Sequence, residues 1–249
     1  MRFRGVCLAL LLAAALLLGG CGEYRDDIKQ INAGVTALSD LTSGRITVTT
    51  DVQAEGGVIS LYDSAYVSDY RYQIDVKTFN YAVEKRDMDG DLLEAPYKVI
   101  NAHKYDLTTG AEDETYEGKI GDFPDLLAFF FGAGLKGGYV GSVEPLTDET
   151  HPDWKGFHVI KSEKYIERVN SSRDKDGADG IMLSSYVDYW LDAAGVLVRM
   201  DYVSRDAVTQ VVGADENGEG GETLEDTINQ KYTFELMDYN DPEIFAGIE

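Results

Sequence analysis

Aliphatic residues near the beginning of the chain recur every three or four positions, the spacing that places them on one face of a helix. The pattern predicts an amphipathic helix within residues 22–43, with Gly44 as its C-terminal cap. The charges beside the apolar stripe are mostly acidic, which favours packing on the protein's own sheet over contact with lipid. The stripe consists of Ile28, Ile31, Val35, Leu38 and Leu41.

From Arg45 onward the hydrophobic period changes to two. Ile46 and Val48 alternate with Thr47 and Thr49, as expected for a strand with one solvent-facing side. Strands and helices do not alternate regularly, so an antiparallel sheet is predicted rather than a doubly wound parallel one. Further strands are predicted over residues 70–77, 79–86, 97–106, 114–119, 139–143, 157–166, 183–191, 196–205 and 230–236.

Turn signals rich in glycine separate the predicted strands. Residues 213–223 are acidic and glycine-rich, and they predict a loop or the tip of a long hairpin between the last two strands. The shorter turn signals lie at residues 55–57, 89–91, 108–110, 176–177 and 193–195.

A second helix is predicted within residues 121–135. Asp122 is a suitable N-terminal cap, Pro124 would lie in the first turn, and glycines follow the apolar run. The helix is apolar almost all round, so it should be buried on several sides and cover the concave face of the sheet. Its large apolar residues are Leu126, Leu127, Phe129, Phe130 and Phe131.

The first twenty-one residues have the order of parts found in an export signal. Arg2 and Arg4 precede an apolar stretch over residues 6–18, and small residues then lead to Cys21. A transmembrane anchor is the main alternative, but the stretch is shorter than the roughly 20 residues that span a bilayer. No cluster of basic residues follows it. An ordinary secretory signal peptide is the other alternative.

The sequence Leu18-Gly19-Gly20-Cys21 resembles the lipobox of bacterial lipoprotein signal peptides. The resemblance implies that residues 1–20 are removed and that Cys21 becomes a lipid-modified N-terminus, which anchors the protein to the extracytoplasmic face of a membrane. Each buried CH₂ of such an anchor contributes about 0.8 kcal/mol. Cys7 would leave with the signal peptide, so no disulfide is expected in residues 21–249, which we interpret as a single domain.

The charge balance narrows the classes of partner. The chain of 249 residues has a net charge of -23, and removal of residues 1–20, which hold two arginines and no acid, gives about -25. So acidic a domain disfavours nucleic acid and anionic lipid headgroups as nonspecific partners, because both would be repelled, and no nucleic-acid partner is expected. We expect a monomer.

Residues 87–91 resemble the opening of a calcium-binding loop. Counted from Asp87, however, an EF-hand needs glycine at Leu92 and glutamate at Lys98. Residues 174–180 fail in a similar way, so hairpin turns are predicted at both places, with weak calcium binding left open. The histidines, His103, His151 and His158, lack metal-ligand spacing. We therefore expect no cofactor, and without a catalytic motif we expect no enzyme.

The most diagnostic segment after the signal peptide is residues 186–202. An aromatic strand leads into an Asp-x-x-Gly turn at Asp192, and an apolar strand leaves it. With the helix before the first strand and the late strand over residues 231–241, this resembles extracytoplasmic lipoproteins with a LolA/LppX-type half-barrel. The resemblance implies an α+β fold: a single curved antiparallel sheet, with the N-terminal helix and the short Phe-rich helix packed on its concave face.

The resemblance also implies a function, noncovalent binding of a lipid or other apolar ligand between sheet and helices. The five large apolar residues of the Phe-rich helix would line or gate that space; the alternative is that they only fill the core. A second hypothesis is a structural or interaction module of the cell envelope that presents an acidic surface, including residues 213–223, to a protein partner.

Overall fold

The computed structural model describes residues 24–56, 63–75, 78–119, 123–176, 180–212 and 221–245. Cys21 and the predicted signal peptide lie outside these ranges, as does most of the predicted loop over residues 213–223. The helices are α2 (Arg25–Ala37), α3 (Asp125–Phe131) and α4 (Glu163–Asp176), and the short 3-10 turns are η1 (Leu38–Asp40), η3 (Gly137–Tyr139) and η4 (Pro242–Phe245).

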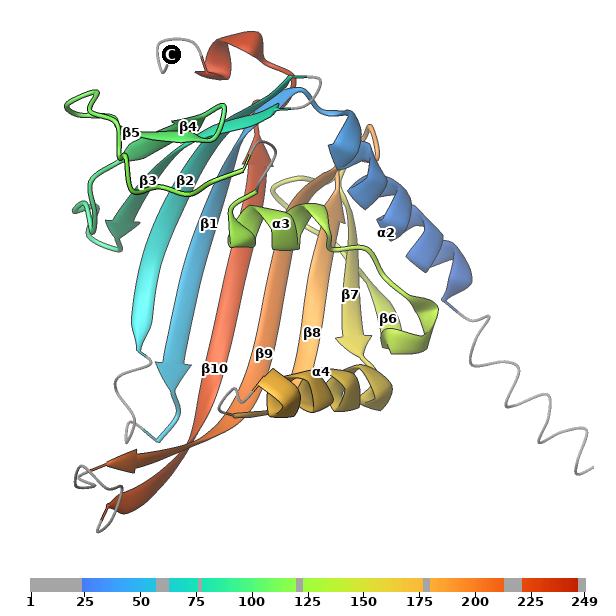
Figure 1. The fold of residues 1–249 in the computed structure, drawn as a ribbon. Helices are drawn as coiled ribbons and strands as arrows, with labels where there is room; N and C mark the ends of the chain where they lie inside the picture. Colours follow the sequence, from blue (N-terminus) through green and yellow to red (C-terminus); the bar gives the residue numbers. More distant parts are fainter. Residues whose placement is uncertain are drawn as a thin grey trace, which may run out of the picture.

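Ten strands form one curved antiparallel sheet that does not close (Figure 1). The order is β5-β4-β3-β2-β1-β10-β9-β8-β7-β6, so the sheet consists of two meanders joined where β1 pairs with β10. The fold is therefore α+β, as predicted. The strands are β1 (Ser43–Ala54), β2 (Ser64–Asp75), β3 (Thr78–Asp87), β4 (Tyr97–Ile100), β5 (His103–Asp106), β6 (Val140–Leu146), β7 (Lys155–Lys161), β8 (Ile181–Leu191), β9 (Leu197–Val212) and β10 (Glu222–Met237).

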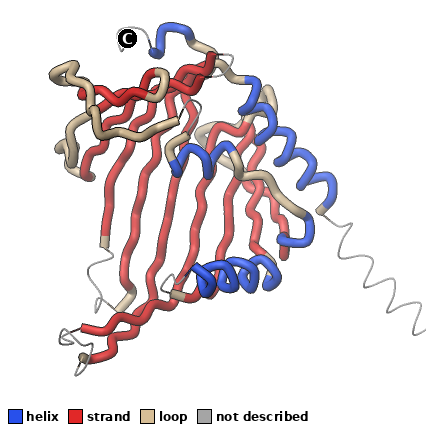
Figure 2. Tube along the Cα trace, viewed as in Figure 1, coloured by secondary structure: helices blue, strands red, loops and turns tan. Residues whose placement is uncertain are grey.

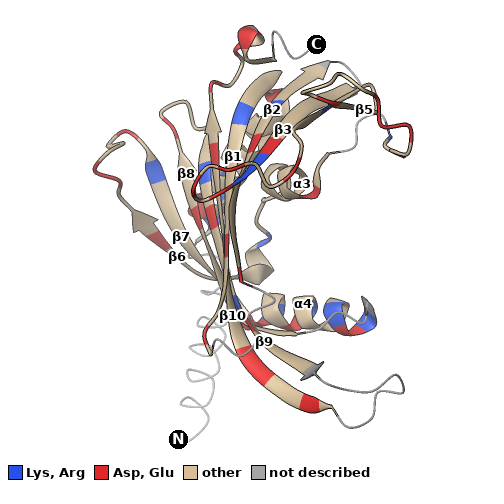
Figure 3. Ribbon diagram, turned by 90° about the vertical axis from the view of Figure 1, so that its left-hand side faces the viewer, with Lys and Arg blue, Asp and Glu red and all other residues tan. Residues whose placement is uncertain are grey.

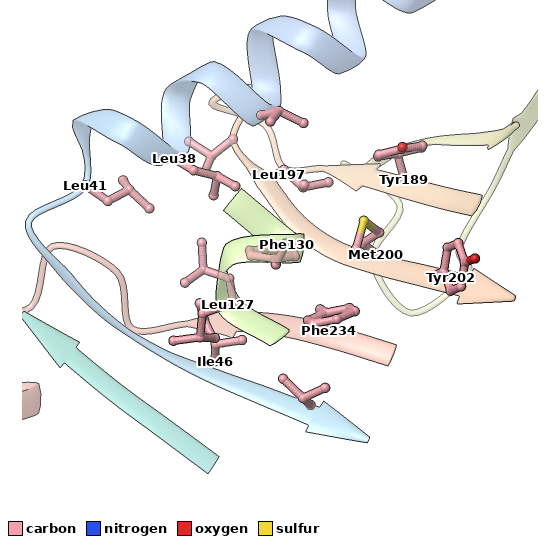
Figure 4. Packing of buried hydrophobic residues seen from close by; sticks show 14 of the residues in the cluster. Leu38, Leu41, Ile46, Leu127, Phe130, Tyr189, Leu197, Met200, Tyr202 and Phe234 are labelled. Carbon is pink, nitrogen blue, oxygen red and sulfur yellow. The ribbon is translucent and has the colours of Figure 1, made fainter. Parts of the chain in front are cut away.

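The helices lie against the strands rather than between them (Figure 2). With the sheet seen nearly edge-on, α3 and α4 lie on the same side of it (Figure 3). The main apolar cluster occupies this side and joins Phe234 of β10, Met200 of β9 and Tyr189 of β8 to Leu127 and Phe130 of α3 (Figure 4). We call this side the inner face.

The first predicted helix is confirmed, and its apolar stripe contacts the protein's own core. Ile31, Val35 and Leu38 are buried in the main cluster. The helix ends earlier than predicted, however, and Gly44 lies inside β1 instead of capping it. Glycine is needed there because a Cβ would lie 2.9 Å from the hydroxyl oxygen of Tyr72.

Side-chain hydrogen bonds fix α2 to the loop that follows α3. The amide of Asn32 donates to the carbonyl oxygen of Leu135 at 2.9 Å, and its oxygen accepts from the Leu135 N–H at 2.6 Å. Gly34 allows α2 to approach the β8–β9 turn, because a Cβ would lie 2.4 Å from Leu191 Cδ2. The N-terminal helix thus helps to position α3.

Three strand predictions are wrong. The segment over residues 97–106 is two strands, because Asn101 and Ala102 adopt positive φ angles of 53° and 68° and turn the chain. Residues 114–119 form no strand; Asp113 begins a turn there by accepting hydrogen bonds from the backbone N–H and hydroxyl of Thr115. The strand over residues 157–166 ends at Lys161.

The helix α4 was not predicted from the sequence. It occupies residues where the end of a strand and a hairpin turn at 176–177 were predicted. Polar side chains make its hydrogen bonds to the sheet: Arg173 donates to the buried carboxylate of Asp206 at 3.0 Å and 3.3 Å, and Asn170 hydrogen-bonds with both backbone polar groups of Met182. Because few apolar side chains are buried, the hydrophobic period that reveals a helix is weak.

Candidate functional site

A hollow lies on the inner face between α3, α4 and the sheet. Its volume is about 220 Å³. Val187, Met200 and Tyr202 belong to the sheet part of its lining, while Phe129 belongs to α3 and Tyr165 to α4. We call it the interhelical hollow.

The Phe-rich helix forms where it was predicted, although it is only seven residues long. Pro124 occupies the position before its first residue, where the missing N–H costs nothing. Asp122, the predicted cap, lies outside the described residues. The helix ends at Gly132, where the chain turns toward the loop held by Asn32.

The five apolar residues of α3 have different environments. Leu127 and Phe130 are fully buried, and Phe130 stacks on Phe234 with ring centroids 5.4 Å apart. Leu126 and Phe131 are partly buried against the same core. Among the five, Phe129 lines the interhelical hollow.

Phe129 presents much of its ring to solvent. The residue is 41% exposed, and its ring lies edge-on to Tyr202 at 5.1 Å and tilted to Phe234 at 5.8 Å. These contacts hold the ring against the sheet while one side remains uncovered. An apolar ligand in the hollow would contact this uncovered side.

Lys161, the last residue of β7, lines the same hollow. Its Nζ lies 5.3 Å from the centre of the Tyr165 ring. Burial lowers the pKa of Lys161 to about 8, because the charged ammonium loses hydration. Lys161 forms no ion pair with a carboxylate of the described residues.

Tyrosines complete the polar part of the lining. Burial is the main cause that raises the pKa of Tyr165 to about 12, and the neighbouring Tyr202 contributes to this rise. The Tyr189 hydroxyl donates to the carbonyl oxygen of Ala133 at 2.9 Å, and burial also raises the pKa of Tyr189. The hydroxyls of Tyr165 and Tyr189 therefore remain protonated at neutral pH.

A second hollow adjoins the first at Lys161, which lines both. Its volume is about 350 Å³, and its apolar lining comes from Ile160, Ile166 and Leu183. Ile160 and Leu183 are 43% and 48% exposed. Lys161 therefore lies where two partly apolar hollows meet.

Sequence reasoning missed Lys161 and Tyr165 because it placed both in one strand. A signal was present: Ser162 is a favoured residue before a helix, and the backbone N–H groups of Tyr165 and Ile166 both donate to its carbonyl oxygen. Recognising that start would have placed Lys161 at a strand–helix junction, next to the hollow.

The calcium-like segments have other structures. The predicted turn after Asp87 is confirmed, because Asp87 Oδ1 accepts from the N–H groups of Asp89 and Asp91. Residues 174–176 end α4 instead of forming a hairpin, and residues 177–179 lie outside the described ranges. Within the described part of the chain, no group of three His, Cys, Asp or Glu residues could hold a metal ion.

Each histidine pairs with a carboxylate. The ring Nδ1 atoms of His103, His151 and His158 lie 2.6 Å, 3.3 Å and 2.5 Å from carboxylate oxygens of Glu112, Asp148 and Asp188, respectively. Each pair is separate from the two hollows. Among the described residues, no helix has both the length and the apolar character needed to cross a membrane.

Comparison with known proteins assigns the chain to no family. No protein-family model matches the sequence. No curated protein matches it either.

Proposed function

We propose that the protein is a membrane-anchored bacterial lipoprotein that binds a lipid or other apolar ligand without chemical conversion. Cys21 carries the lipid anchor, and residues 21–249 form one extracytoplasmic domain with a half-barrel of the LolA/LppX type. The ligand lies between α3, α4 and the concave face of the sheet.

The observation that carries this proposal is the uncovered ring of Phe129 in the interhelical hollow. Apolar surface in contact with water costs about 25 cal/mol per Å² relative to burial. A ligand chain that covers the exposed side of Phe129, which is 41% exposed, would recover part of this free energy. Ligand sites commonly combine such apolar walls with a few polar groups, and Lys161 and Tyr165 supply these here.

The proposed anchor suits this role. The helix α2 begins at Arg25, four residues after Cys21 in the sequence. So short a connection keeps the domain close to the membrane surface, where an apolar ligand can transfer without crossing much water.

Mass spectrometry of the protein extracted from membranes tests the proposal. We expect the wild-type protein to retain a lipid, and Phe129→Ser to lose most of it because the apolar wall becomes polar. Phe123→Ser is the matched control: Phe123 is also an exposed aromatic residue, 37% exposed, but it does not line the hollow. Wild-type protein free of bound lipid, or equal retention by both variants, contradicts the proposal.

One feature favours the second function, an interaction module. Beyond Ala207 and Ile228, β9 and β10 pair mainly with each other and form a two-stranded extension of the sheet (Figure 1). Glu222 and Glu225 are exposed on it. If this extension binds a basic partner, Glu222→Lys with Glu225→Lys should abolish a defined cross-link in membranes while lipid retention is unchanged; an unaltered cross-link pattern excludes this role.

A further inference from the structure

Lys161 has no carboxylate partner among the described residues, whereas two partly buried arginines each have one. Arg173 pairs with Asp206 at 3.0 Å, and Arg199 pairs with Asp201 at 2.9 Å. The chain holds 45 acidic residues against 22 Lys and Arg residues, so carboxylates are abundant. Lys161 nevertheless forms no ion pair with any carboxylate of the described residues.

An unpaired ammonium in a partly buried position lowers stability, because it loses hydration without gaining a counter-charge. Contact with the Tyr165 ring compensates only in part, since the centroid lies 5.3 Å away. A bound anion would supply the missing counter-charge. The position of Lys161 at the junction of two hollows leaves room for one.

The groups around Lys161 are arranged with polar and apolar parts. Tyr165 and Tyr202 carry hydroxyl groups, and Phe129, which is 41% exposed, supplies exposed apolar surface in the same hollow. A ligand with an anionic head and an alkyl chain satisfies both parts at once. A neutral lipid leaves the ammonium unpaired, and a cationic amphiphile is repelled by it.

We infer that Lys161 binds the anionic head, a carboxylate or phosphate monoester, of a single-chain amphiphile whose alkyl chain lies along Phe129. This inference rests on the proposed function and names its ligand class. The interhelical hollow, about 220 Å³, is smaller than the roughly 300 to 1,000 Å³ typical of ligand sites. One chain therefore fits this space better than two, with the second hollow as its continuation past Lys161.

Photo-crosslinking of the full-length protein in nanodiscs of phosphatidylcholine tests the inference. The probes are twelve-carbon chains with a diazirine near the end and a carboxylate, phosphate or alcohol head, so that only the head differs. Peptide mapping then reports labelling at the interhelical hollow. The bilayer concentration of a given probe is the same whichever protein variant is present. Labelling of the variants by that probe can therefore be compared directly.

We expect an anionic probe to label the wild-type hollow, and Lys161→Met to raise its half-saturating concentration roughly 30-fold, the effect of removing one partner from a partly buried charge pair. Lys161→Arg should restore most of the labelling. Lys164→Met is the matched control, because Lys164 is exposed and lines neither hollow. The alcohol probe should respond equally to wild type and Lys161→Met.

Other outcomes separate the two proposals. If all three probes label the wild-type hollow equally and Lys161→Met changes none of them, the role of Lys161 is excluded while apolar ligand binding stands. If no probe labels the hollow, the proposed function itself fails. If inorganic phosphate displaces an anionic probe as effectively as the unlabelled twelve-carbon phosphate does, the alkyl chain contributes nothing and the amphiphile is excluded.

Discussion

The interhelical hollow has two helical walls that are attached to the same sheet by opposite kinds of interaction. Phe130 fixes α3 through an aromatic stack on Phe234, inside the main apolar cluster. Arg173 fixes α4 through the buried carboxylate of Asp206, with Asn170 bonded to Met182. One wall therefore depends on apolar burial and the other on hydrogen-bonded charge, and the two should respond to different perturbations.

Removal of the buried ring should have the largest effect. Phe130→Ala should lower the free energy of unfolding by about 3–5 kcal/mol, because it leaves a cavity next to Phe234. Urea denaturation followed by circular dichroism measures the change. Phe129→Ala, one residue earlier but half-exposed, should cost less than about 2 kcal/mol; equal losses would show that α3 is not anchored through Phe130.

Removal of the charge pair should affect the other wall. Arg173→Ala removes the cation that pairs with the Asp206 carboxylate. Asp206 is only 1% exposed. We expect a loss of about 2 kcal/mol and faster hydrogen exchange of α4 amides with no change in α3. Lys175→Ala on the same helix is the control, since Lys175 is exposed. Faster exchange in both helices would contradict independent attachment of the two walls.

The smallest effect concerns Lys161, and its sign depends on pH. The pKa of Lys161 falls from its ordinary 10.5 to about 8 on folding, so at pH 7 the charged form destabilises the folded protein. Lys161→Met should therefore be more stable than wild type by about 1–2 kcal/mol at pH 7.

The stability advantage of Lys161→Met should shrink as the pH rises from about 8 to 10.5. In this range the wild-type protein gains stability because Lys161 releases its proton on folding. Urea midpoints at each pH, compared with Lys164→Met, measure the difference. Glu163 and Glu167 of the second hollow and Tyr165 also face this region. A pH-independent advantage would contradict the perturbed pKa.

The same contrast explains what the sequence could and could not predict. Ile31, Val35 and Leu38 reveal α2 because each repeats the helical period with an apolar side chain that is buried. The Phe-rich helix was visible for the same reason. In contrast, α4 contacts the sheet through Arg173 and Asn170, and polar residues on a buried face give no periodic signal.

The site was predicted only in part. The apolar wall could be located from composition. The sequence did not show, however, that Phe130 is buried and Phe129 exposed, because two adjacent apolar residues of a helix point in different directions that the sequence alone does not assign. The role of Lys161 depends on a strand–helix junction and on the lack of an ion pair with any described carboxylate, which are properties of three-dimensional arrangement. The lipid anchor at Cys21 and the ligand remain predictions.

The pairing of β1 with β10 has a consequence for how the molecule assembles in time. Arg45 lies opposite Met237, so the middle of the sheet forms only once residues far apart in the sequence are both available. Until then one edge of β1 has no neighbour and could join a strand of another molecule. Every second residue in the middle of this strand is polar: Thr47, Thr49 and Asp51. Such polar positions reduce pairing with strands of other molecules before β10 pairs with β1. Contacts so distant in sequence also make slow folding the expected kinetic behaviour.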